Sequence, residues 1–229
     1  MNSRGISNRP RVGWLLIVAS ALTTAGLLAG VAMQWVQNAP FPPSVSISTY
    51  GLGPNGWVFT LAMTSVGLAT IPLLLAIHRQ WPPIPRLVWP LMLTWVVCVL
   101  IVGWIRTSAP GQIVDGWVIV HRSAAVVGMI AFPVAVALLT VSRIRRGECT
   151  PLEAVLTLLL VTASEVSLIL VAAGSIGKFD LTGLGYKHAP GLFEFAAALI
   201  DVVIMYVVVW SALAHRRRRS RAPMAASSS

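Results

Sequence analysis

Charged side chains are scarce in this sequence. Only 10% of its 229 residues are Asp, Glu, Lys or Arg, whereas 56% are hydrophobic and the mean hydropathy is +0.80. Soluble domains carry roughly 25% charged residues, and several stretches of about 20 residues here contain almost no polar side chain to cover a water-facing surface. The composition therefore argues against an ordinary soluble domain and indicates an integral membrane protein.

Cysteine and the common catalytic motifs are also sparse or absent. Cys98 lies within an apolar stretch and Cys149 beside an arginine cluster, so we expect no disulfide between them. The chain has no Walker loop, no GxSxG sequence and no dinucleotide fingerprint, which argues against nucleotide chemistry.

A haem pair needs two facing histidines, and a zinc hydrolase needs a cluster of histidines and carboxylates. Since His121 is the one histidine in the interior of a predicted span, and His78 stands at the very end of another, we expect no cofactor and no bound metal.

Six apolar stretches have the length that a hydrocarbon layer of about 30 Å requires. All six are expected to be helices, because an isolated strand cannot satisfy its backbone hydrogen bonds in lipid. The predicted fold class is therefore all-α, a polytopic membrane protein with six transmembrane helices in one bundle. The predicted spans are residues 12–36, 56–78, 87–105, 117–141, 152–174 and 191–214.

The basic residues predict how this bundle is oriented. Thirteen of the 17 lie in the tails and connections of one side, and four lie on the other. Because basic loops stay in the cytoplasm, both tails are predicted to be cytoplasmic. We expect an N-terminal tail over residues 1–11, a transmembrane domain over 12–214, and a basic, disordered tail over 215–229. That last tail is expected to meet anionic lipid headgroups and not nucleic acid, and the predicted location is the inner (plasma) membrane of a bacterial cell.

The nine tryptophans agree with this map, since the indole ring prefers the membrane interface. Eight of them fall near the ends of predicted spans, and Trp95 alone is predicted to lie deep in the bundle. The predicted outer set is Trp35, Trp57, Trp104 and Trp117, and the predicted inner set is Trp14, Trp81, Trp89 and Trp210.

Gly26 and Gly30 form a GxxxG pair in the first span. Small residues at this spacing let a neighbouring helix approach closely. We expect that neighbour to be another helix of the same chain. A homodimer contact through Gly26 and Gly30 is the alternative.

Ionisable side chains within the spans are candidates for function, because a charge at the bilayer centre costs at least about 2.5 kcal/mol. At about 1.5 Å per residue, Glu165 and Asp201 lie roughly 13 to 15 Å below the outer ends of their helices. His121, Arg122 and Glu194 lie only about one turn below the outer boundary. Glu194 and Asp201 are seven residues apart and share one helix face. We expect these five residues to form a polar cluster in the outer half of the bundle.

The stretch VSISTYGLGPNGW, residues 45–57, precedes the second span and carries hydroxyl groups and glycines but no charge. We interpret the connection that contains it, residues 37–55, as a lid that lies over the mouth of a cavity. Residues 45–56 are predicted to be ordered and to contact the outer ends of the fourth and sixth helices near His121 and Glu194. The candidate ligand-binding side chains of the lid are Ser46, Ser48, Thr49 and Tyr50.

Three functions are open at this point, beside a purely structural network of protonated acids. The leading hypothesis is a non-enzymatic protein that binds a lipid headgroup or a small solute in an outer-half polar cavity. The alternative is a small proton-coupled transporter that uses Glu165 and Asp201, because intramembrane acids are common in proton relays. The third is a membrane-embedded hydrolase that uses His121 with a carboxylate.

Three stretches carry a resemblance to a known family. They are SISTYGLGPNGWVF before the second span, VHRSAAVVGMIAFPVAVALL in the fourth, and PGLFEFAAALIDVVIMYVVVW in the sixth. With the span count and loop lengths, they resemble the bacterial six-helix membrane proteins catalogued as domain of unknown function 998. In that family a basic residue often follows the Gly-Leu that opens the last helix, whereas this chain reads GLFEF, which counts against an ion pair there. The resemblance implies an inner-membrane protein and a fold, but no activity.

Overall fold

A computed structural model describes residues 9–36, 46–108, 114–175 and 189–225 of the protein. Within these ranges the chain forms six α-helices and one short 3₁₀-helix, η2, and no strand. Each predicted span coincides with one α-helix to within a few residues in most cases, which confirms the all-α class. The elements are α1 (Arg9–Val36), η2 (Ile47–Gly51), α2 (Gly56–Gln80), α3 (Val88–Trp104), α4 (Gly116–Arg145), α5 (Pro151–Ser175) and α6 (Ala189–Ala225).

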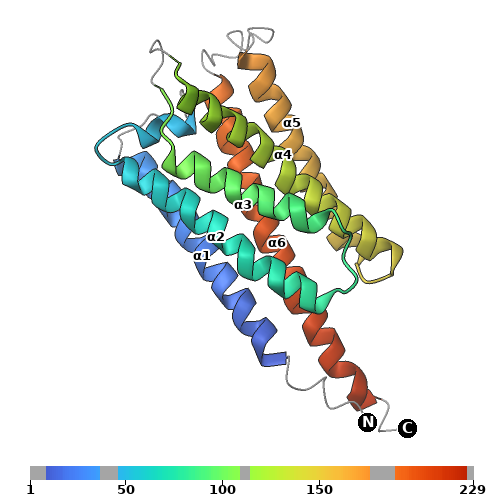
Figure 1. The fold of residues 1–229 in the computed structure, drawn as a ribbon. Helices are drawn as coiled ribbons and strands as arrows, with labels where there is room; N and C mark the ends of the chain where they lie inside the picture. The colour runs from blue at the N-terminus through green and yellow to red at the C-terminus, as the bar shows by residue number, and fades with distance from the viewer. Residues whose placement is uncertain (1–8, 37–45, 109–113, 176–188, 226–229) are drawn as a thin grey trace.

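The helices run alternately up and down, so that the start of α1 and the end of α6 lie at the same end of the bundle (Figure 1). We call this the lower end, and the opposite end, which carries η2, the upper end. Helices that are adjacent in sequence pack side by side, and α6 packs in addition against α1, α2 and α4. The last helix therefore closes the bundle around a common interior.

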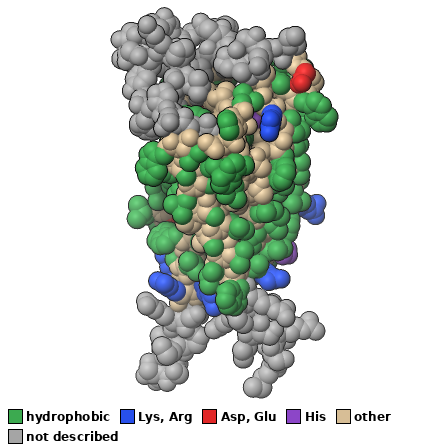
Figure 2. All heavy atoms as spheres, turned by 90° about the vertical axis from the view of Figure 1, so that its left-hand side faces the viewer, with side chains coloured by type: hydrophobic (Ala, Val, Ile, Leu, Met, Phe, Trp, Pro, Cys, Tyr) green, Lys and Arg blue, Asp and Glu red, His purple; other side chains and the backbone are tan. Residues whose placement is uncertain are grey.

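The outer surface of the bundle is strongly apolar. Figure 2 shows a band of hydrophobic side chains between the two ends, with Lys and Arg side chains mainly near its lower margin. Five helices in the described residues, α1, α2, α4, α5 and α6, are long and apolar enough to cross a membrane, and α3 is a shorter apolar helix. Soluble monomers rarely expose so continuous an apolar surface. The protein is therefore a multi-pass membrane protein.

The tryptophans follow the predicted map with one exception. Trp95 is buried as expected: its ring stacks on Phe132 at 5.0 Å between centroids, and its Nε1 donates to Thr70 at 3.1 Å. Trp81 was expected at the interface, but the structure shows it only 1% exposed. It is buried because an arginine, Arg143, lies over its ring. Large exposed rings belong to Trp14, Trp35, Trp57, Trp104, Trp117 and Trp210.

Gly26 and Gly30 have different surroundings. A Cβ atom on Gly26 would lie 2.6 Å from a methyl group of Val66, so this glycine lets α1 and α2 of the same chain pack closely. A Cβ atom on Gly30 would meet nothing within 4 Å, because Gly30 lines a cavity. The close contact within the chain that the GxxxG pair predicts is therefore made at Gly26.

Both ends of the chain extend the predicted helices. α6 continues to Ala225, whereas a disordered tail was expected from residue 215. Alanine and arginine are good helix formers, and extending an existing helix avoids the cost of nucleation. The predicted tail residues 1–8 and 226–229 lie outside the described residues, as do residues 37–45 of the predicted lid.

Candidate functional site

A cavity of about 160 Å³ lies inside the bundle and is lined by α1, α2, α3, α4, α6 and η2. Its walls are almost entirely apolar, which differs from the polar cavity that the sequence predicted. Of the five ionisable residues expected there, only Glu194 and Asp201 line it, both from one face of α6. The lid segment contributes an apolar side chain, Ile47, and not its hydroxyl groups.

Glu194 holds η2 against the first turns of α6. Its Oε2 atom accepts a hydrogen bond from Ser46 Oγ at 2.5 Å and one from the Ile47 backbone N–H at 3.3 Å, and the Ser48 N–H also donates to this carboxyl. The Ser46 and Ser48 hydroxyls are 2.9 Å apart. The predicted contact between this segment and the sixth helix at Glu194 is confirmed.

Thr49 and Tyr50 stabilise η2 itself. Thr49 Oγ1 donates to the Ser46 carbonyl at 2.7 Å, which closes the turn locally. The Tyr50 side chain is buried beside Met33 and Phe59, and its hydroxyl accepts from Gln34 Nε2 on α1 at 3.4 Å. Neither residue lines the cavity, so their predicted role in ligand binding stays a prediction.

The glycines of the segment explain how it turns back onto α2. A Cβ atom on Gly56 would lie 2.3 Å from the carbonyl oxygen of Gly51. Only a residue without a side chain allows this approach. The close contact lets α2 begin directly beneath η2, and this places Ile47 over the cavity.

Asp201 is the most deeply buried acid that lines the cavity, with 2% of its surface exposed. Its Oδ1 atom accepts a hydrogen bond from Ser164 Oγ on α5 at 2.7 Å. Its Oδ2 atom has no hydrogen-bond partner among the described residues. Glu165, which follows Ser164, is close enough to interact electrostatically with Asp201, and its buried Oε1 likewise lacks a partner in the described chain. The structure therefore brings these two predicted residues together.

His121 and Arg122 lie elsewhere. His121 is 2% exposed, and its Nδ1 atom lies 2.6 Å from the Ile105 carbonyl at the end of α3. Among the described residues no hydrogen bond joins it to Glu194 or to η2, so the predicted reach of the lid to His121 finds no such support. The Arg122 side chain is exposed on the outer surface. No group of three or more His, Cys, Asp and Glu side chains in the described ranges could hold a metal ion.

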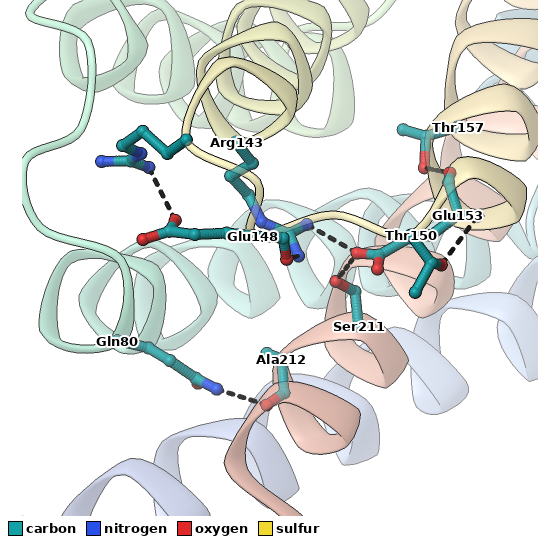
Figure 3. A network of polar contacts seen from close by, with 9 residues as sticks. Gln80, Arg143, Glu148, Thr150, Glu153, Thr157, Ser211 and Ala212 are labelled. Carbon is teal, nitrogen blue, oxygen red and sulfur yellow. Dashed lines mark hydrogen bonds and ion pairs between the residues drawn. The ribbon is translucent and has the colours of Figure 1, made fainter. Parts of the chain in front are cut away.

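A second polar cluster lies at the lower end, where the sequence predicted none (Figure 3). Arg143 on α4 forms an ion pair of 2.7 Å with Glu153 on α5, and each side chain is only 5% exposed. Ser211 on α6 donates to the same carboxylate, and the Arg143 guanidinium lies 3.8 Å from the centre of the Trp81 ring. This cluster ties three helices and the α2–α3 connection together.

The sequence contained a signal for this cluster. Arg143 was assigned to the cytoplasmic charge that sets orientation, and Glu153 was not considered as a site residue. Thr150 and Glu153 have the spacing of a capping box, and the Glu153 N–H donates to Thr150 Oγ1 at 3.3 Å. A carboxylate fixed in the first turn of α5, directly after an arginine-rich connection, was the available indication of a buried ion pair.

Comparison with known proteins gives one match. A family described as "Protein of unknown function (DUF998)" matches residues 17–211, which include the cavity, η2 and both members of the buried ion pair. No curated protein and no solved structure matches the chain. Since the matched range covers well over half of the sequence, the chain belongs to the DUF998 family.

Proposed function

We propose that this protein binds a membrane lipid or a small solute in the cavity beneath η2, without enzymatic chemistry. The observation that supports this proposal is the cavity itself, about 160 Å³ of space with apolar walls and one deeply buried carboxyl group. A dry apolar cavity of about 150 Å³ is large enough to hold benzene. The part of a ligand that enters this space is therefore apolar, with at most one polar group.

In this proposal η2 is the cover of the site. Ile47 contributes to the cavity wall, while Glu194 holds the backbone of the same segment in place. A ligand that enters from the upper end has to displace η2, and this breaks the hydrogen bonds to Glu194. One that enters from the bilayer has to pass between helices.

The proposal includes six spans with both termini in the cytoplasm of the cell. α3 has 17 residues, which at 1.5 Å each is about 25 Å, near the lower limit for crossing a bilayer. The excess of basic residues at the lower end supports a cytoplasmic position for that end. The upper end, with η2, then faces the outside of a bacterial plasma membrane, and the arginines of α6 face anionic headgroups on the inside.

Proton-coupled transport is the second candidate. Asp201 Oδ2 and Glu165 Oε1 are buried acceptors without partners among the described residues, and each can take up a proton. Hydrolysis has no comparable support. The Nδ1 atom of His121 is hydrogen-bonded to the Ile105 carbonyl oxygen, and no described contact joins the ring to a carboxylate.

Filling the cavity tests the proposed binding. Gly30 lines the cavity, and a Cβ atom there would meet nothing within 4 Å, so the side chain of Gly30→Leu extends into the open space. Gly116 also has open space but is exposed at the start of α4, so Gly116→Leu is the matched control. Native mass spectrometry of the purified proteins should show a lipid or solute bound to the wild type and to Gly116→Leu, and lost from Gly30→Leu. Equal occupancy in both variants would rule out binding in this cavity.

Proteoliposomes containing a pH-sensitive dye separate binding from transport. If the ligand found by mass spectrometry moves together with protons, its addition changes the internal pH, and the double variant Glu165→Gln/Asp201→Asn removes the change. Binding without any proton movement in the wild type would remove the transporter hypothesis.

A further inference from the structure

Asp201 is an unusual residue for the wall of an apolar cavity. It is 2% exposed and lines the cavity, yet its Oδ2 atom has no hydrogen-bond partner in the described part of the chain. Ser164 satisfies only the other oxygen. Buried polar atoms in native proteins are nearly always paired, because an unpaired one is costly. The free oxygen therefore indicates a hydrogen-bond donor that the ligand supplies.

The ionisable groups around the cavity indicate whether that donor carries a charge. Three carboxyl groups, those of Glu165, Glu194 and Asp201, lie at or near the cavity. The two ion pairs in the described residues are both at the lower end, between Arg143 and Glu153 and between Arg146 and Glu148. Within those residues no basic side chain pairs with the three acids, and apolar surroundings disfavour an isolated carboxylate. A bound cation would supply the missing counter-charge, and its attraction to a carboxylate is strong where water is excluded.

The walls are also suited to a cation with a hydrocarbon body. The rings of Phe59, Trp95 and Phe195 line the cavity, and aromatic rings attract ammonium groups. Met63 and Met129 line it as well, and flexible methionine side chains adapt to irregular apolar shapes.

We infer that the ligand of this cavity is a lipophilic primary or secondary ammonium ion. Its N–H group donates to Asp201 Oδ2, and its hydrocarbon part fills the apolar space. This inference rests on the proposed binding function and specifies the ligand class. A quaternary ammonium ion lacks the N–H that Oδ2 needs, and a neutral alcohol supplies the hydrogen bond without the charge.

Three probes of nearly the same size test this class: benzylammonium, benzyl alcohol and toluene. Each is added at pH 7 to the purified full-length protein in phosphatidylcholine nanodiscs, and binding is measured by saturation-transfer difference NMR. We expect benzylammonium to bind the wild type at least roughly tenfold more tightly than benzyl alcohol, as for a hydrogen bond to a charged group. Asp201→Asn should reduce benzylammonium binding to the level of the alcohol. Glu148→Gln, which removes a carboxylate at the lower end, should leave all three affinities unchanged.

The outcomes distinguish the inference from the proposed function. If the three probes bind the wild type equally, or if Asp201→Asn leaves benzylammonium binding intact, the inferred ammonium class is wrong. The proposed binding function still stands in that case, provided that Gly30→Leu removes the bound molecule. If no probe binds and no copurified molecule responds to Gly30→Leu, both proposals fail. Should Asp201→Asn not fold, the order of the probes on the wild type decides the question.

Discussion

Removing one partner of the buried ion pair at the lower end is expected to destabilise the bundle strongly. Arg143 and Glu153 are 2.7 Å apart, and each side chain is 5% exposed. Glu153→Gln keeps an acceptor for Ser211 but leaves the Arg143 guanidinium without a counter-charge. Arg143 cannot move to water without leaving the Trp81 ring and the Glu148 carbonyl, to which it donates at 3.2 Å.

The burial of this ion pair indicates how much stability is lost, and a second ion pair provides the control. Breaking a buried ion pair from one side costs about 3–5 kcal/mol, because the remaining charge stays buried. The pair between Arg146 and Glu148 is partly exposed, 24% and 21%, so Glu148→Gln should cost clearly less, about 1 kcal/mol. Replacing both buried partners, as in Arg143→Met/Glu153→Leu, removes the charge entirely and should be much less damaging than Glu153→Gln alone.

The assay is reversible unfolding in mixed micelles with increasing sodium dodecyl sulfate, followed by circular dichroism. The expected order of stability places Glu148→Gln near the wild type, the double variant next, and Glu153→Gln last. If Glu153→Gln loses no more than Glu148→Gln, or if the double variant is as unstable as the single one, the two charges are not coupled. The lower-end cluster would then not stabilise the bundle through its ion pair.

Three further predictions concern the close helix contact, η2 and the free thiol. Gly26→Leu should destabilise the protein by about 1–3 kcal/mol in the same assay, because it forces apart α1 and α2, whereas Gly30→Leu should not. Ser46→Ala removes a donor to Glu194 and should accelerate amide exchange across η2 roughly tenfold, and unchanged exchange would contradict its anchoring role. Burial raises the pKa of the Cys149 thiol, with Arg143 opposing this rise, so less thiolate is present at pH 7 and maleimide should react slowly, faster as the pH rises. An impermeant maleimide should reach Cys149 only from the cytoplasmic side, and labelling from the outside would overturn the proposed orientation.

The arrangement of helices could be predicted because the bilayer fixes their length and composition. The helices begin or end where polar or turn-forming residues interrupt an apolar run, as at Gly56, where α2 begins, and at Pro151, where α5 begins. Trp81 shows the limit of this reasoning. Its place at the end of a span suggested the interface, but a cation held over its ring keeps it inside the bundle. Hydropathy indicates how deep a residue lies along the membrane normal. It does not indicate whether the side chain points into the bundle or away from it.

The candidate site could be predicted only in part for the same reason. Ser46 was identified as a hydroxyl in the connection before the second span, and Glu194 and Asp201 from their residue type and depth. Ser46 and Glu194 meet as expected. Which side chains form the cavity walls depends on how far each helix is rotated about its axis. A helix that is apolar on nearly all sides does not reveal this rotation in its sequence. His121 illustrates this, since its depth suggested a place in one polar cluster with Glu194, whereas the end of α3 supplies the Ile105 carbonyl as its hydrogen-bond partner.

The hydrogen bond between Ser46 and Glu194 also bears on how the protein is made. The two residues are 148 positions apart, so a ribosome has synthesised most of the chain before the acceptor for Ser46 exists. Until α6 enters the membrane, the face of the cavity that Asp201 and Glu194 will line is open to lipid. Assembly is thus completed by the last segment to be translated, and a chain that ends before residue 189 should reach the membrane with η2 held only by α1 and α2 and be a substrate for quality-control proteases.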